Sequence, residues 1–110
     1  MRQGEIWFAD LNPTKGSEQT GKRPVVIISG DTLNDALPIV IVVPITSKIK
    51  SYPTCVLLLA NKTNGLKGDS EAVPFKVRAI TKKRLTKHIG HLSEAELREI
   101  LKGLFLALTH

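Results

Sequence analysis

Residues 38–46 read PIVIVVPIT, a run in which apolar and β-branched residues occupy both sets of alternating positions. Successive side chains of a β-strand point to opposite faces, so this pattern predicts a strand that is buried on both faces. Residues 24–29, PVVIIS, repeat the pattern and begin with Pro24, whose missing N–H is tolerated at a strand's first residue. The two runs therefore predict the centre of a sheet.

Further strands are predicted on both sides of this centre. Residues 54–60, TCVLLLA, predict a third buried strand, in which Cys55 would be a small buried apolar residue. Pro74 interrupts the strand-like residues 70–80 and indicates a bulge or an edge. EIWFADL near the N-terminus predicts a first strand, HIGHL a short last one, and GDTLND, residues 30–35, a turn.

The C-terminal segment has helical periodicity instead. Ser93 and Glu96 form the pattern of a capping box, and Leu92 is placed to pack on Leu97. One apolar stripe follows, in which Phe105 is expected to be buried, made of Leu97, Ile100, Leu101, Leu104, Phe105 and Leu108. Five or six short strands and one helix predict a single domain over residues 1–110, mainly β, in which the helix lies against a small barrel or curled sheet.

Composition narrows the classes of function. The net charge of +6 favours an anionic partner, although a basic surface without a dedicated partner explains it equally well. A single cysteine and three scattered histidines exclude a disulfide framework and the usual zinc spacings. The apolar runs are too short to span a bilayer and the N-terminus is too polar for a secretory signal, so we expect a cytoplasmic protein.

Residues 16–24, GSEQTGKRP, come within one residue of a phosphate-binding loop, with Arg23 where Ser or Thr should hold magnesium. Such a loop must open a helix, but this one leads into Pro24 and a predicted strand. ATP or GTP binding is therefore not expected, and the segment instead presents several polar and cationic side chains beside a strand.

The stretch GEIWFADLNPTKGSEQTGKRPVVIIS, followed by VVPITS, GDSEAV and KKRL, resembles the MazF/PemK family of toxin endoribonucleases over nearly the whole chain. The resemblance implies a small SH3-like barrel of the CcdB/MazF type that forms a homodimer. It also implies metal-independent cleavage of single-stranded RNA without any cofactor, and inhibition by an acidic, MazE-like antitoxin. A barrel too small to cover the apolar strands and helix is a second reason to expect a dimer.

The resemblance assigns catalysis to Arg23 and Thr46, with Glu18 as the matching acidic residue and a candidate base. Metal-free RNA cleavage needs the 2′-hydroxyl deprotonated, the 5′-oxygen protonated and a cation beside the phosphorane. It leaves a 2′,3′-cyclic phosphate and a 5′-hydroxyl. The fork of N–H donors on an arginine suits that cation. Expected RNA contacts are Ser17, Gln19, Lys22, Ser47, Tyr52, Ser70, Lys76 and Arg78.

Two of the expected RNA contacts bear on how the substrate is recognised, and four other functions compete with this assignment. Lys76 replaces the family's commoner glutamine, which leaves the target sequence open. Tyr52 is the best candidate for stacking on a base, although packing within its own loop explains it equally well. His88 and His91 could form a two-histidine ribonuclease, but three residues apart on a strand they would face opposite sides. Asp69 and Glu71 could bind magnesium. A non-catalytic CcdB-like gyrase poison and a plain SH3-like nucleic-acid-binding module are the remaining two functions.

Overall fold

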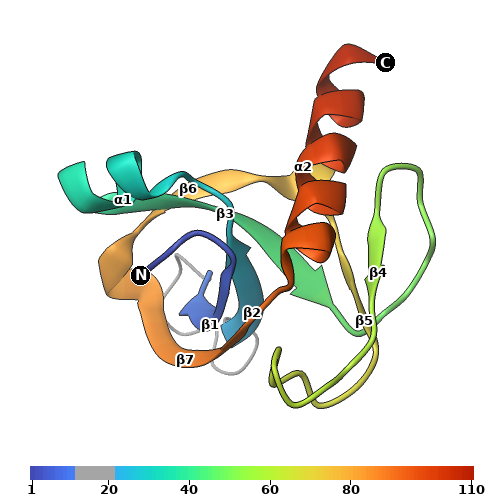
Figure 1. The fold of residues 1–110 in the computed structure, drawn as a ribbon, viewed down its shortest axis with the longest axis horizontal. Coiled ribbons are helices and arrows are strands. Elements are labelled where there is room, and N and C mark those ends of the chain that lie inside the picture. The colour runs from blue at the N-terminus through green and yellow to red at the C-terminus, as the bar shows by residue number, and fades with distance from the viewer. Residues whose placement is uncertain (12–21) are drawn as a thin grey trace.

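A curled antiparallel sheet with one long helix forms the protein. The computed structural model describes residues 1–11 and 22–110. The strands are β1 (Glu5–Asp10), β2 (Lys22–Ile27), β3 (Ile39–Thr46), β4 (Val56–Leu58), β5 (Ser70–Ala72), β6 (Arg78–Thr81) and β7 (Leu85–His91). The helices are α1 (Asp31–Ala36) and α2 (Glu94–Thr109), with 3-10 turns at η1 (Pro74–Lys76) and η2 (Lys82–Arg84). Figure 1 shows α2 beside β4, and α1 on the opposite side of the molecule.

β3 is the hub of the sheet. The strand order is β4-β5-β3-β2-β1-β7, and β6 also pairs with β3. One edge of β3 carries β2, and the other carries β6 along its first half and β5 along its last two residues. Among the described residues β4 and β7 end the sheet without pairing to each other, so it is curled but open. The predicted mainly β class with a C-terminal helix is confirmed.

The two central strands are buried on both faces, as their sequences predict. Val26, Val43 and Ile45 belong to the core under α2, together with Leu92 and Ile100. Val25, Ile27 and Val42 belong to a second apolar cluster on the opposite face of the ladder, with Val40, Ile80 and Leu85. The apolar alternation therefore builds two cores, one on each side of the β2–β3 ladder.

α2 begins as predicted. The Ser93 hydroxyl accepts a hydrogen bond from the Glu96 N–H at 3.1 Å, and the Glu96 carboxylate accepts one from the Ser93 N–H at 3.0 Å. Leu92 and Leu97 pack in the same core. Gly103 lets the helix approach closely, because a Cβ there would lie 2.5 Å from the Thr54 carbonyl oxygen. The predicted burial of Phe105 is wrong, since that side chain is 64 % exposed.

Three other predictions need correction. Residues 30–35 are not a simple turn but mostly helix α1, because the buried Asn34 amide bonds back to the Ser29 carbonyl and the Asp31 carboxylate. The predicted buried strand at 54–60 is only the edge strand β4, in which Leu57 is exposed like the following Leu59, and Cys55 is only partly buried. Residues 70–80 form two strands, because Pro74 opens a 3-10 turn between them.

Candidate functional site

The candidate site lies at the end of the β2–β3 ladder. Val25 is paired with Pro44, and extending this antiparallel register by two residues places Arg23 across from Thr46. Because side chains alternate along a strand, Arg23 and Thr46 lie on the face of the second apolar cluster, beyond Val25 and Val42. Pro24 and Ile45 lie on the other face. The end of one ladder therefore supplies two different surfaces.

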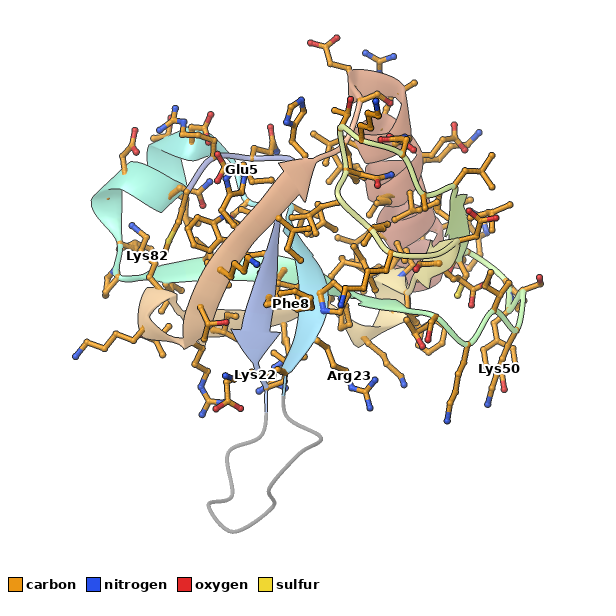
Figure 2. All side chains as sticks on the ribbon, turned by 90° about the horizontal axis from the view of Figure 1, so that it is seen from below. Glu5, Phe8, Lys22, Arg23, Lys50 and Lys82 are labelled. Carbon is orange, nitrogen blue, oxygen red and sulfur yellow. The ribbon has the colours of Figure 1, made fainter. Side chains whose placement is uncertain are left out.

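On the first surface is a hollow of about 430 Å³, which we call the cationic hollow. Arg23 comes from β2, Thr46 from β3, Arg78 from β6 and Lys76 from η1. Its lining consists of Leu11, Arg23, Pro44, Ile45, Thr46, Lys48, Lys50, Lys76 and Arg78. These nine side chains include five cations and no carboxylate, which makes the hollow a strong attractor for anions. In Figure 2, Lys22, Arg23 and Lys50 project from one side of the molecule, whereas Lys82 lies by α1, where its ammonium donates to the Asn34 carbonyl.

A buried carboxylate fixes the segment that carries two of these lysines. Glu71 is 4 % exposed, and its two oxygens accept hydrogen bonds from the backbone N–H groups of Lys50 at 3.2 Å and Ser51 at 2.9 Å. Ser51 has a positive φ of 54°, a conformation that these bonds help to hold. The Thr46 hydroxyl accepts the Lys48 N–H at 3.1 Å, which leaves its own proton able to point at another acceptor.

An aromatic shelf continues the cationic hollow. A neighbouring hollow shares Thr46 with it and is also lined by Tyr52, Phe75 and Glu71. The rings of Tyr52 and Phe75 are 6.3 Å apart between centroids, and the Lys50 ammonium lies 5.9 Å from the centre of the Tyr52 ring. Tyr52 is 51 % exposed, so its ring is accessible for stacking as the sequence predicts for it.

The second surface is a hollow of about 440 Å³, which we call the apolar pocket. Phe8, Pro24, Ile45, Leu66 and Ile89 give its walls, and the cations Lys22, Arg23, Lys67 and Lys87 also line it. Ser47 and Ser70 belong to it as well, but Ser70 is buried and its hydroxyl donates to the Gly68 carbonyl at 2.9 Å. Arg23 and Ile45 border both hollows, so the two surfaces are continuous.

The structure brings most of the predicted residues together. Arg23, Thr46, Lys76 and Arg78 share the cationic hollow, with Tyr52 next to it, while Lys22, Ser47 and Ser70 line the apolar pocket. Ser17, Glu18 and Gln19 lie outside the described residues. The sequence did not indicate Lys48, Lys50, Lys67 or Lys87 as site residues. The alternating lysines of TSKIK, directly after Thr46, were a usable signal for the first two.

None of the competing catalytic groups, His88, His91, Asp69 and Glu71, lines the cationic hollow. The His88 ring packs on Trp7 at 5.2 Å between centroids, and its Nε2 lies 3.9 Å from Glu5. The Asp69 carboxylate accepts the Ala60 N–H at 2.9 Å, and Glu71 holds the 50–51 backbone. Within residues 1–11 and 22–110, no three histidine, cysteine or acidic side chains come together as metal ligands would.

Comparison with known proteins identifies the family. A model of the PemK-like, MazF-like toxins of type II toxin-antitoxin systems matches residues 2–108. The endoribonuclease MazF9 of Mycobacterium tuberculosis is 43 % identical over 114 residues, covering 98 % of this chain and 96 % of that protein. This chain belongs to the PemK/MazF-like toxin family.

Solved structures share the fold. MazF from Deinococcus radiodurans superposes with a TM-score of 0.82 at 24 % identity, covering 100 % of this chain and 97 % of that one. A mycobacterial endoribonuclease in complex with its cognate antitoxin has a TM-score of 0.81 at 22 % identity, covering 98 % and 94 %. Neither helix that the structure describes is long and apolar enough to cross a membrane.

The thiol of Cys55 lies next to Glu71, so its pKa depends on the charge of that carboxylate. Burial, and then the negative charge and hydrogen bond of Glu71, raise the pKa of the Cys55 thiol. We expect Glu71→Gln to lower this pKa, because the neutral amide no longer opposes formation of the thiolate. The measurement is the rate of alkylation by iodoacetamide as a function of pH, whose midpoint should move to lower pH. Asp69→Asn is the control, and an unmoved midpoint in folded Glu71→Gln protein would contradict the contact.

Proposed function

We propose that this protein is the toxin of a toxin-antitoxin pair and cleaves single-stranded RNA at specific sequences without a metal ion. The observation that carries the proposal is the cationic hollow, where Arg23 and Thr46 meet four further cations and no described carboxylate. The 43 % identity to an endoribonuclease over nearly the whole chain supports the same reading. It disfavours both a CcdB-like gyrase poison and a binding module without activity.

The hollow suits a phosphate that gains negative charge during the reaction. Attack of the 2′-hydroxyl on the adjacent phosphorus produces a phosphorane whose non-bridging oxygens carry more charge than the starting diester. Arg23 can place two parallel N–H donors on those oxygens, and Thr46 can donate one hydrogen bond from the adjacent strand. The lysines Lys48, Lys50 and Lys76 would hold the flanking phosphates, which fixes the register of the strand.

Proton transfer is the remaining chemical requirement. Among the side chains that line the cationic hollow in the described part of the chain, none is a carboxylate or an imidazole. Glu71 borders the neighbouring hollow, but both of its oxygens already accept backbone N–H groups. We therefore retain Glu18, which lies outside the described residues, as the predicted base for the 2′-hydroxyl. As the bond from the 2′-oxygen to phosphorus forms, the bond from phosphorus to the 5′-oxygen breaks, and that oxygen takes up a proton to leave as the 5′-hydroxyl. Glu71 acts as the residue that positions the lysine segment.

An acidic antitoxin is the proposed protein partner. A related Deinococcus radiodurans MazF has been solved with MazE, and a mycobacterial endoribonuclease with its cognate antitoxin. In this chain, the net charge of +6 and the five cations of the hollow would attract an acidic segment as well as RNA. A segment lying across the hollow would exclude the substrate.

Arg23 gives the most direct test. Arg23→Ala should lower the rate of RNA cleavage by roughly 10²–10³-fold or more, since preorganised charge stabilisation in the transition state is worth that much. Arg23→Lys should restore only part of the rate, because an ammonium lacks the planar fork. The side chain is exposed, so the thermal midpoint should hardly move. Lys62→Ala, at an exposed turn outside both hollows, is the matched control. Near wild-type cleavage by Arg23→Ala would refute the assignment.

The substrate tests the chemistry independently of the protein. An RNA with one 2′-deoxy sugar directly 5′ of the cleaved phosphate should bind nearly as well as the parent yet resist cleavage, because the nucleophile is missing while the phosphates remain. EDTA should leave the rate unchanged, and the fragments should end in a 2′,3′-cyclic phosphate and a 5′-hydroxyl. Loss of activity in chelator that magnesium restores would instead indicate a metal-dependent nuclease.

The exposed apolar residues of α2 and the β4 region support the expected homodimer. Leu57, Leu59, Phe105 and Leu108 are each more than half exposed, and β4 and α2 are neighbours in the fold. A self-complementary contact would cover them. We expect sedimentation at micromolar concentration to show a dimer, and Phe105→Glu to shift it toward monomer. Leu37→Glu, at the exposed end of α1 on the opposite side, should not. A wild-type protein that sediments only as a monomer would exclude the dimer.

A further inference from the structure

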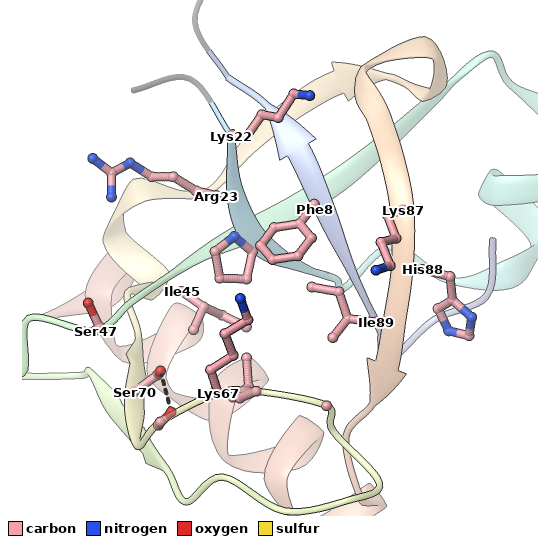
Figure 3. A pocket seen from close by; sticks show the side chains of 14 residues that line it. Phe8, Lys22, Arg23, Ile45, Ser47, Lys67, Ser70, Lys87, His88 and Ile89 are labelled. Atoms are coloured by element: carbon pink, nitrogen blue, oxygen red, sulfur yellow. Dashed lines mark hydrogen bonds between the residues drawn. The ribbon is translucent and has the colours of Figure 1, made fainter. Parts of the chain in front are cut away.

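The apolar pocket has no role in the chemistry proposed above, although it borders the reacting site. Figure 3 shows Phe8, Ile45 and Ile89 facing its interior, the Lys67 side chain reaching into it and the Lys87 ammonium directed toward it. Lys22, Arg23 and His88 point away from the interior in the same view. The apolar pocket thus has an aromatic wall and two ammonium groups that point inward, and none of the described residues that line it is acidic.

The wall that carries Lys67 is held in place. Asn64 is 1 % exposed; its side chain donates to the Leu59 carbonyl at 2.9 Å and accepts the Leu66 N–H at 3.0 Å. Gly65 has φ of +68°, and a Cβ there would lie 2.4 Å from the Ile89 carbonyl oxygen, so the loop is pressed against β7. Because this wall is fixed, the apolar pocket is open before any ligand binds. Less conformational entropy is then lost when the ligand binds.

The apolar pocket is continuous with the cationic hollow, and this continuity indicates what kind of ligand the pocket binds. Arg23 and Ile45 line both hollows. Because side chains alternate along β2 and β3, the groups that attract phosphate lie on one face of the ladder and the apolar pocket on the other. When a phosphate of single-stranded RNA lies beside Arg23, one base of that RNA can therefore reach the adjacent apolar pocket. Bases combine an apolar face that stacks on rings such as Phe8 with a polar edge that needs partners.

The polar groups of the apolar pocket determine which hydrogen-bonding edge of a base fits it. Lysine ammonium groups only donate hydrogen bonds, so Lys67 and Lys87 match carbonyl and ring-nitrogen acceptors. Guanine presents O6 and N7 as acceptors, and uracil, like thymine, presents O4. On that same edge adenine and cytosine present an exocyclic amino group instead of a carbonyl, and its donors would face these ammonium groups with no carboxylate of the lining to receive them. The amino group of guanine lies on its other, minor-groove edge.

We propose that the apolar pocket binds one base of the RNA that flanks the cleaved phosphate, and that it selects uracil or guanine over adenine and cytosine. Phe8 supplies the stacking surface, and Lys67 and Lys87 read the carbonyl edge. This inference rests on the proposed function for its substrate, but it concerns recognition instead of the chemical step.

The test uses uncleavable strands. Fluorescence anisotropy gives the affinities of the full-length protein for 2′-O-methyl oligouridine and oligoadenosine, and the ratio of the two is the readout. We expect the wild type to bind oligouridine several-fold more tightly, and Lys67→Met with Lys87→Met to abolish that preference. Phe8→Leu keeps an apolar side chain and should weaken binding of both strands by roughly tenfold through lost stacking. Lys62→Met controls for the loss of charge in the same loop.

The outcomes separate the two proposals. If the wild type cleaves RNA but the lysine variants keep the wild-type affinity ratio, the base pocket is wrong and the proposed function stands. If the wild type cleaves no RNA while the ratio falls as expected, the pocket stands and the nuclease proposal fails. If the variants weaken binding of an acidic peptide and leave both oligonucleotides unchanged, the pocket is a protein-docking site and the proposal is overturned.

Discussion

The pairing of β2 with β3 is the constraint on which the rest of the structure depends. Val25, Val26 and Ile27 lie against Val42, Val43 and Pro44, and this ladder has an apolar core on each face. A slip of one residue would exchange the two faces and disrupt both cores, so burial specifies the register strongly. The same register fixes Arg23 opposite Thr46. Two side chains that are far apart in the sequence are thus placed by packing that involves neither of them.

Gathering five cations in one hollow is the second constraint, since like charges repel. The structure meets it by drawing them from different elements and leaving them at the solvent-facing rim, where water screens their repulsion. Glu71 contributes differently: it is buried under the lysine segment and accepts its N–H groups, so its charge fixes the backbone without occupying the hollow. The negative charge that the hollow itself lacks would then come from the phosphates of the substrate.

Much of this arrangement could be predicted where local pattern and tertiary structure agree. The two central strands, the capping box of Ser93 and Glu96, and the joint placement of Arg23 and Thr46 all follow from the sequence and the resemblance. Helix α1 could not be predicted, because Asp31 and Asn34 are turn residues by composition and become helical through contacts with Ser29 and the N-terminal segment. Lys67 and Lys87 could not be predicted for a related reason. Only the fold brings the 61–69 loop onto β7 and makes two separate surface lysines face one pocket.

The division of the ladder end into two faces separates two demands that conflict in one site. Stabilising a phosphorane requires concentrated positive charge near water-accessible oxygens, whereas distinguishing one base from another requires an apolar slot with few and well-placed polar groups. Under the proposed function, alternation along two strands assigns the first demand to the face of Arg23 and Thr46 and the second to the face of Pro24 and Ile45. The proposed chemical face needs only a phosphate and a 2′-hydroxyl, which every RNA offers. If the apolar pocket binds a base as proposed, changes in its walls would alter sequence preference without disturbing the reacting groups. Lys67 stands on a loop outside the β2–β3 ladder, so it is free to vary independently of the core that holds Arg23 in place.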